Sequence, residues 1–392
     1  MQKRMNFARL FFLTPVIFSL FLLPGCHSGK TGVSAPPAPK KPAVRVSDAD
    51  IQAFKPNEVG AIMVIMYHRI DKKRPNGPMN RTPDQFRKDL DSLYNSNYRP
   101  VNISDIIDNN MDVPGGKTPV AISFDDSWDS QFRVMVGKDG QTHIDPNCAV
   151  GIMETFNKTH PDWPNKATFF VLPQEAQIPP PFYQAEAVND KLEYLTKHGY
   201  EIGNHTATHP GSMRTMPVEQ VKWQIAQAIR DIRKINPDAQ LQVLAVPYGN
   251  VPRQAAAKQA LLSGTEGGTT YKNKAIVLAA WRPIMSPVAK AGKSIMPSGQ
   301  IAAYNPYRIE RVLPDPKQAN KAGTLEYYLK FFKDNPTIRY VSDGNLNVVT
   351  VPASNQRLVD AAKVKAQGKT LQVYGGSGEP SATSHGGALN VE

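Results

Sequence analysis

Short apolar runs alternate along the chain with segments in which apolar residues recur at helical spacing. The runs are rich in Val, Ile, Phe and Tyr, which is typical of buried strands. They occupy residues 61–67, 119–124, 167–172, 200–203, 241–246 and 274–280. The helical segments occupy residues 82–95, 149–158, 184–198, 217–235 and 253–262. Strand followed by helix, repeated, predicts an α/β fold with parallel strands, either an open doubly wound sheet or a barrel. Ligands bind at the carboxyl ends of the strands in both cases.

The first 26 residues have a different pattern. A basic segment, 1–9, precedes 13 mostly apolar residues, 10–22, and the sequence Leu-Pro-Gly-Cys ends at Cys26. A membrane-spanning helix needs about 20 residues, so this run predicts a removable signal. It resembles a bacterial lipoprotein signal peptide, cleaved before Cys26, whose sulfur would carry the lipid anchor. An ordinary secretory peptide is the alternative.

Composition divides the rest of the chain into three parts. Pro and Lys dominate residues 26–55, which we expect to form a semi-rigid tether. Gly and Ser gather after residue 374, and we expect 354–392 to be a flexible tail. Residues 56–353 are predicted to form a single folded domain, preceded by the signal peptide, 1–25, and the tether.

The net charge of +12 on 392 residues is concentrated at the ends of the chain. The signal, tether and tail carry seven of these charges and leave +5 on residues 56–353. A nucleic-acid partner is therefore not needed to explain the charge. The chain has only two cysteines, Cys26 and Cys148, which excludes a disulfide scaffold and a Cys-rich zinc module.

Polar residues with suggestive chemistry follow two of the predicted strands. Asp125 and Asp126 directly follow the strand 119–124, and His205 and His209 follow the strand 200–203. Adjacent carboxylates repel each other unless a cation lies nearby. One carboxylate and two imidazoles suit Zn²⁺ or a related divalent ion, which leaves the other carboxylate free to act as a base. A turn or helix cap explains an Asp pair alone, and a surface loop explains a His pair alone, but the two together favour a metal site.

These motifs resemble those of the polysaccharide deacetylases with NodB homology, carbohydrate esterase family four. Ser123–Asp126 is similar to the first motif, 167–171 to the next strand, and Gly203–Pro210 to the metal-binding motif. The resemblance implies a distorted (β/α) barrel of about seven units. It also implies metal-dependent hydrolysis of N-acetyl groups on a polysaccharide of N-acetylated amino sugars.

The resemblance assigns roles to the four residues above. It implies that Asp125 is the general base and that Asp126, His205 and His209 hold a divalent metal. Zn²⁺ is the expected ion, with Co²⁺, Ni²⁺ and Mn²⁺ as alternatives.

One departure from the family concerns the acid that protonates the departing amine. Most members take it from a late histidine, but no histidine lies between residues 210 and 384. The segment Met66–Ile70 instead resembles the circularly permuted poly-N-acetylglucosamine deacetylases, whose acid histidine precedes the Asp pair. We therefore expect His68 to be the acid. The alternative is a histidine that caps a strand end.

A second departure is the missing arginine of the third motif, where this chain has Ala245–Gly249. Asp125 would then be less acidic, unless another cation approaches it from a different loop. The candidates for this cation are Arg69, Arg282 and Arg308.

Two aromatic residues are expected to contact substrate, Tyr248 in the third motif and Trp281 after the strand 274–280. A core tryptophan is the alternative for Trp281. The expected partners are an N-acetylated polysaccharide and, through Cys26, a membrane, without a protein or nucleic-acid partner. We expect an extracytoplasmic, membrane-anchored protein, or a secreted one if the lipid site is not used. A carbohydrate O-acetyl esterase and a degenerate carbohydrate-binding lipoprotein are the alternative functions.

Overall fold

The computed structural model describes residues 45–74, 76–173, 179–296 and 299–376. The chain divides into two units, 1–43 and 44–392, and all the described residues belong to the second. The predicted signal peptide and Cys26 therefore lie outside the described residues. Among the helices of the described ranges, none is both long enough and apolar enough to span a membrane.

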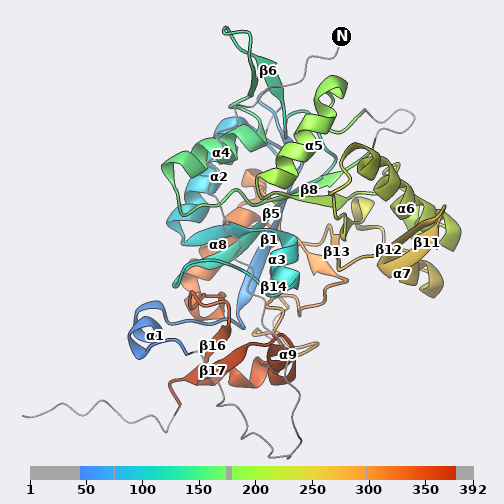
Figure 1. Ribbon diagram of the computed structural model, residues 1–392. Coiled ribbons are helices and arrows are strands. Elements are labelled where there is room, and N and C mark those ends of the chain that lie inside the picture. Colours follow the sequence, from blue (N-terminus) through green and yellow to red (C-terminus); the bar gives the residue numbers. More distant parts are fainter. Residues whose placement is uncertain (1–44, 75, 174–178, 297–298, 377–392) are drawn as a thin grey trace, which may run out of the picture. The chain divides into compact units, whose positions relative to one another are not determined.

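Seven parallel strands form the centre of the domain (Figure 1). In order around the sheet they are β1 (Ala61–Tyr67), β5 (Thr118–Phe124), β8 (Thr168–Val171), β9 (Glu201–Asn204), β10 (Val243–Ala245), β13 (Ala275–Leu278) and β15 (Ile309–Glu310). The circle closes just after β15, where Val312 pairs in parallel with Ile65 of β1 through backbone hydrogen bonds of 2.9 and 2.8 Å. The sheet is a distorted (β/α) barrel, which confirms the predicted fold class.

Shorter strands extend this barrel and decorate its ends. β4 (Tyr98–Val101) is parallel to the first half of β5, and β14 (Ile284–Met285) is antiparallel to the start of β1. Four two-stranded sheets are formed by β2 (Arg69–Ile70) with β3 (Asn80–Arg81), β6 (Val134–Val136) with β7 (Thr142–Ile144), β11 (Ser263–Glu266) with β12 (Thr269–Lys272), and β16 (Val348–Pro352) with β17 (Thr370–Tyr374).

Helices connect and cover the strands. They are α1 (Asp48–Phe54), α2 (Pro83–Asn95), α3 (Ile103–Ile107), α4 (Ala149–Thr159), α5 (Val188–Lys197), α6 (Val218–Ile235), α7 (Ala255–Leu262), α8 (Leu325–Asp334) and α9 (Ala361–Ala366). All five predicted helices are present within three residues of the expected ends, apart from a short 3-10 turn, Ala185–Ala187, before α5. Local chemistry explains the boundaries: for example, the Thr82 hydroxyl caps α2, and Pro83 occupies its first turn.

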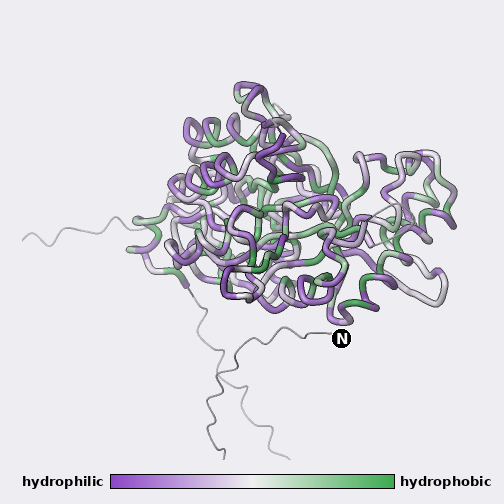
Figure 2. Tube along the Cα trace, turned by 90° about the horizontal axis from the view of Figure 1, so that it is seen from above, coloured by the Kyte–Doolittle hydropathy of each residue, from purple (hydrophilic) through white to green (hydrophobic). Residues whose placement is uncertain are grey.

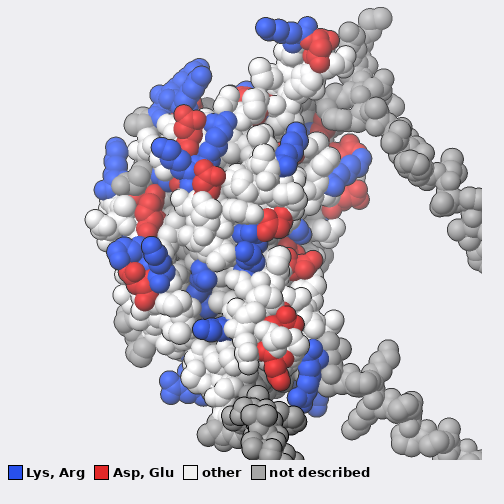
Figure 3. All heavy atoms as spheres, turned by 90° about the vertical axis from the view of Figure 1, so that its left-hand side faces the viewer, with Lys and Arg blue, Asp and Glu red and all other residues white. Residues whose placement is uncertain are grey.

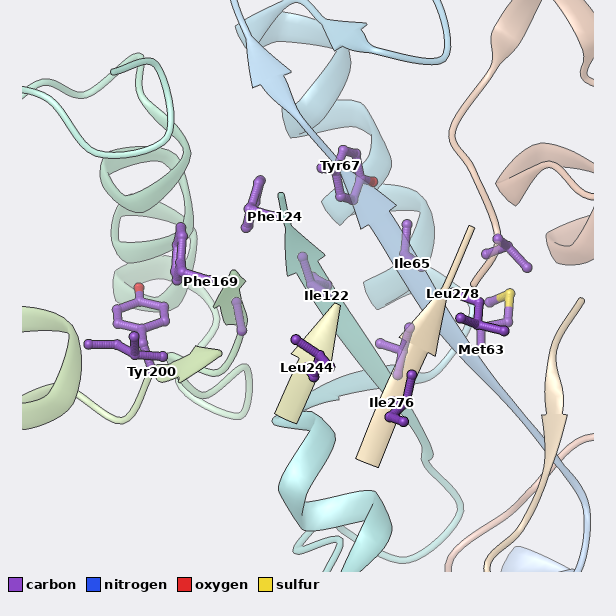
Figure 4. Close-up of a cluster of buried hydrophobic side chains, with 14 of the residues drawn as sticks. Met63, Ile65, Tyr67, Ile122, Phe124, Phe169, Tyr200, Leu244, Ile276 and Leu278 are labelled. Atoms are coloured by element: carbon purple, nitrogen blue, oxygen red, sulfur yellow. The ribbon is translucent and has the colours of Figure 1, made fainter. Parts of the chain in front are cut away.

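Side chains alternate along the barrel strands between two cores. Met63, Ile65, Tyr67, Ile122 and Phe124 lie in the larger cluster, which also contains the buried faces of the helices (Figure 4). The residues between them belong to a second cluster that fills the barrel, including Ile62, Val64, Ala121, Ala245 and Val277. Viewed from above, the hydrophobic segments concentrate toward the middle of the domain (Figure 2). Successive side chains of a strand point to opposite faces. A residue that follows a strand in the same alternation therefore also points into the barrel, at its mouth.

Two predicted boundaries are wrong, because both ends of the described chain are folded. Part of the expected tether forms α1, which is capped by Ser47 and buries Ile51. Part of the expected tail forms β17, which pairs with β16 over five residues. The Tyr374 hydroxyl donates a 3.0 Å hydrogen bond to the Pro56 carbonyl, which joins the two ends. The folded domain therefore extends beyond 56–353 on both sides.

Candidate active site at the mouth of the barrel

The strand register brings the chain's candidate residues together. Tyr67 pairs with Phe124, so His68 and Asp125 follow side by side at the carboxyl ends of β1 and β5. The Asp125 backbone N–H donates a 3.0 Å hydrogen bond to the Tyr67 carbonyl, which extends the pairing by one residue. His205 follows β9, two strands further along the sheet.

The backbone leaves these strands in turns that most side chains avoid. Asp126, Ser127, Thr206 and His209 have φ values of 73°, 45°, 71° and 48°. The His209 N–H donates a 3.2 Å hydrogen bond to the Thr206 hydroxyl, which supports the turn. Strained non-glycine backbone of this kind persists where the surrounding structure fixes a functional geometry.

Three side chains present ligand atoms to one point. Oδ1 of Asp126 lies 3.2 Å from Nε2 of His205 and 3.3 Å from Nε2 of His209, and the three ligand atoms lie within 4.8 Å of one another. The Nδ1–H of His205 donates to the carbonyl of Ala245 at 2.9 Å, which fixes the ring and directs Nε2 at Asp126. A carboxylate and two imidazoles in this arrangement fit a divalent metal ion.

The protonation of this cluster follows from burial and mutual charge. Burial would raise the pKa of Asp126, but the hydrogen bond and charge of His205, together with His68 and His209, hold it well below its usual range. Burial and the charge of His205 lower the pKa of His209 to about 4. Asp126 and His209 are therefore already in the forms that bind a cation at neutral pH.

The carboxylate of Asp125 is held by Arg311. Two nitrogens of the guanidinium donate to its two oxygens at 2.6 and 2.8 Å, and both side chains are almost fully buried. Arg311 also donates to the Leu278 carbonyl and the Ser123 hydroxyl, both at 3.2 Å. Burial would raise the pKa of Asp125, but the charge and hydrogen bonds of Arg311, together with the charges of His205 and His68, lower it.

None of the three arginines proposed for this contact from the sequence makes it. Arg282 and Arg308 approach Glu310, at 2.6 and 3.6 Å, and the guanidinium of Arg69 lies 3.5 Å from the ring centre of Trp128. Arg311 directly follows β15, and its side chain points to the face opposite to that of Glu310, so that it reaches Asp125. The sequence carried no clear signal for this contact, because β15 has only two residues and no regular pattern surrounds it.

His68 is buried beside the two carboxylates. Its Nδ1 has no hydrogen-bond partner among the described residues, and its carbonyl accepts a 2.8 Å hydrogen bond from the Gln131 side chain. Burial lowers the pKa of His68, while the charges of Asp125 and Asp126 oppose this shift. The ring is thus within electrostatic reach of both aspartates, and its role as the acid stays a prediction.

The two aromatic residues lie at different places on the rim. Tyr248 is 66% exposed, has a φ of 56°, and its ring centre lies 4.8 Å from that of His209. Trp281 is 44% exposed and lines a separate cleft of about 330 Å³ with Met66 and Met79. The structure therefore brings Tyr248, but not Trp281, into contact with the residues around Asp126.

Comparison with known proteins finds a family match for part of the chain. A family model described as polysaccharide deacetylase matches residues 112–264, which include both aspartates and both histidines of the cluster. A search of curated proteins finds no match.

The solved structures found by comparison share little sequence with this chain. The deacetylase PplD of Streptococcus pyogenes is 17% identical, and the alignment covers 69% of this chain and 97% of that chain with a TM-score of 0.46. The polysaccharide deacetylase BC0361 of Bacillus cereus is 14% identical, with coverage of 69% and 68% and a TM-score of 0.45. IcaB of Ammonifex degensii is 16% identical, with coverage of 66% and 93% and a TM-score of 0.40. The likeness to the polysaccharide deacetylases therefore rests on residues 112–264, the part of the chain that carries the candidate site.

Proposed function

We propose that the protein is a metal-dependent deacetylase that removes N-acetyl groups from a polysaccharide of N-acetylated amino sugars, in a cell wall or an exopolysaccharide. One observation carries this proposal. The ligand atoms of Asp126, His205 and His209 meet within 4.8 Å of one another, and a buried carboxylate, Asp125, lies in the same mouth with Oδ2 at 4.0 Å from Nε2 of His205.

The donor set of Asp126, His205 and His209 would hold the metal, with Zn²⁺ expected before Co²⁺, Ni²⁺ or Mn²⁺. When bound, a divalent ion supplies a Lewis acid for the acetamide carbonyl and lowers the pKa of water. The Nδ1 contact of His205 with the Ala245 carbonyl would keep the ligand nitrogen in place.

The remaining residues would move the protons of the reaction. Asp125 would accept a proton from the water whose oxygen attacks the acetyl carbon, and Arg311 keeps this carboxylate ionised. Each Asp125 oxygen retains a second lone pair for that proton beside its bond to Arg311. When the carbon–nitrogen bond breaks, His68 would give a proton to the nitrogen, so that a free amine and acetate leave. Burial lowers the pKa of His68, which makes its protonated form a stronger acid.

Location at a membrane is a further part of the proposal. The lipoprotein-like signal ending at Cys26 supports a lipid anchor, which would place the domain outside the cytoplasm. On the face shown in Figure 3, basic and acidic side chains are interspersed over the described residues. This mixture is typical of a solvated surface.

Two alternatives share the same residues. An O-acetyl esterase would use the same base and metal on an ester. A degenerate binding protein would have no use for a buried base that is held by two hydrogen bonds to Arg311. The geometry therefore favours an enzyme. Acetate release from N-acetylated and from O-acetylated oligomers distinguishes amide from ester hydrolysis.

Acetate release tests the proposal. Wild-type protein loaded with Zn²⁺ should release acetate from N-acetylglucosamine oligomers faster than from O-acetylated oligomers without N-acetyl groups, and Asp125→Asn should lose nearly all of this activity. Acetate release by Asp125→Asn at the wild-type rate would contradict the mechanism. Faster release by the wild type from the O-acetylated oligomers would show that the protein is an esterase. His68→Ala should lower kcat with unchanged metal content; normal turnover would remove His68 from the mechanism.

A further inference from the structure

Trp128, three residues after Asp125, is held in an aromatic stack at the edge of the candidate site. The guanidinium carbon of Arg69 lies 3.5 Å from the Trp128 ring centre. The ring of Tyr183 is stacked on Trp128, with a centroid distance of 5.6 Å and an interplanar angle of 24°. Cation–π and stacking contacts of this kind fix both the position and the tilt of the indole.

The indole edge meets the metal-ligand candidate Asp126. Nε1–H of Trp128 donates a 3.1 Å hydrogen bond to Oδ2, while Oδ1 is the oxygen that faces His205 and His209. The hydrogen bond therefore restrains rotation of the carboxylate and leaves its ligand oxygen directed at the two imidazoles. Loss of such outer contacts weakens metal affinity by about 10- to 100-fold in metalloproteins.

A strained turn places Tyr183 against the indole. Phe182 and Tyr183 have φ values of 59° and 66°, which is rare for consecutive aromatic residues. The Phe182 side chain is fully buried, and its N–H donates a 2.8 Å hydrogen bond to the Ser127 carbonyl. This anchoring leaves Tyr183 39% exposed. Strained backbone of this kind clusters at active sites and ligand-binding segments.

We propose that the stack of Arg69, Trp128 and Tyr183 is a sugar-binding wall that also positions the metal ligand. Trp128 is a positioning residue for Asp126, and the exposed ring of Tyr183 is a subsite for the apolar face of one pyranose ring of the substrate. This inference rests on the proposed function and adds to it a binding position for the sugar chain and a determinant of metal affinity.

Metal affinity tests the positioning role without a need for activity. Trp128→Phe keeps a ring for Arg69 and Tyr183 but removes the N–H, so the Kd for Zn²⁺, measured by competition with a chelating dye, should rise about 10-fold or more. Arg69→Met should raise the Kd for Zn²⁺ about 3-fold, because the indole loses the cation that packs on it. This variant tests the same role if Trp128→Phe folds poorly. Trp223→Phe on α6 is the matched control and should leave the Kd unchanged. The Tm of the metal-free variants should stay near that of the wild type.

Kinetics test the sugar subsite. Tyr183→Asn tolerates the left-handed backbone and removes the ring, so KM for N-acetylglucosamine oligomers should rise about 3- to 10-fold with little change in kcat. Tyr183→Phe keeps the ring and should retain the wild-type KM.

The outcomes separate this inference from the proposed function. A wild-type protein that neither binds Zn²⁺ nor releases acetate overturns both. If the wild type does both, an unchanged Kd in Trp128→Phe and Arg69→Met overturns the positioning role. An unchanged KM in Tyr183→Asn overturns the subsite.

Discussion

Replacement of Arg311 by Met tests how the buried base is kept charged. Arg311 and Asp125 are 1% and 3% exposed, and the guanidinium donates to both carboxylate oxygens at 2.6 and 2.8 Å. Arg311→Met fills similar space but leaves the carboxylate without its counter-charge. Breaking a buried pair in this way costs about 3–5 kcal/mol, against about 1 kcal/mol or less for an exposed pair.

The sign of the pH dependence follows from the Asp125 pKa. Arg311 lowers this pKa in the folded protein, so the pair stabilises the fold above the unfolded pKa of about 4, and this contribution is lost as the pH falls below it. Without Arg311, burial raises the pKa of Asp125, and the folded variant must either bind a proton or bury a bare charge. The destabilisation should therefore grow as the pH rises from 5 to 8.

Urea unfolding of metal-free protein at pH 5, 6.5 and 8 measures this effect. Asp125→Asn and the double variant complete a thermodynamic cycle, in which the loss in Arg311→Met should be largely suppressed when Asp125 is already neutral. Arg311→Lys keeps the charge without the two-pronged contact and should fall between wild type and Arg311→Met. A loss below about 1 kcal/mol in Arg311→Met, or full additivity with Asp125→Asn, would refute the reasoning.

Two further predictions concern the parts of the domain away from the site. Burial, with the charge of Asp343, raises the pKa of Glu58 from 4.5 to about 8. Between pH 4.5 and 8 the folded state therefore binds a proton that the unfolded state has lost, and the free energy of unfolding should fall by at most about 5 kcal/mol as the pH rises through this range. Glu58→Gln should flatten Tm between pH 5.5 and 8.5, and an unchanged slope would contradict this. A chain that ends at Gln367 loses the five residue pairs between β16 and β17, so its free energy of unfolding should be about 2 kcal/mol or more lower than that of the full chain. Equal stability of the two chains in urea would contradict this prediction.

The sequence was most informative where strands are buried on both faces. β1 and β5 are covered by helices outside and by the second core inside, so they read as continuous apolar runs with clear ends. β15 and β17 were missed because they are short and carry charged or polar residues. α1 was missed because its helical signal lies directly after a Pro-rich stretch, although Ser47 is a recognisable cap.

The site was predictable only as far as its motifs were local. The aspartate pair and the histidine pair follow strands that the apolar pattern identifies, so their meeting could be expected. Arg311 is 186 residues from Asp125 in the chain, and no local pattern reports a contact of that separation. The same holds for Tyr183 and Trp128, whose contact depends on a strained turn at Phe182 rather than on periodicity.

The number of metal ions bound per chain tests the central claim most directly. Protein loaded with Zn²⁺ and freed of excess metal by gel filtration should contain one ion per chain by elemental analysis. The variant His205→Gln/His209→Gln should contain none and remain folded, since both rings lie at the mouth of the barrel. Absence of metal from the wild type, or one ion retained by the variant, would contradict the assignment of Asp126, His205 and His209 as the metal site.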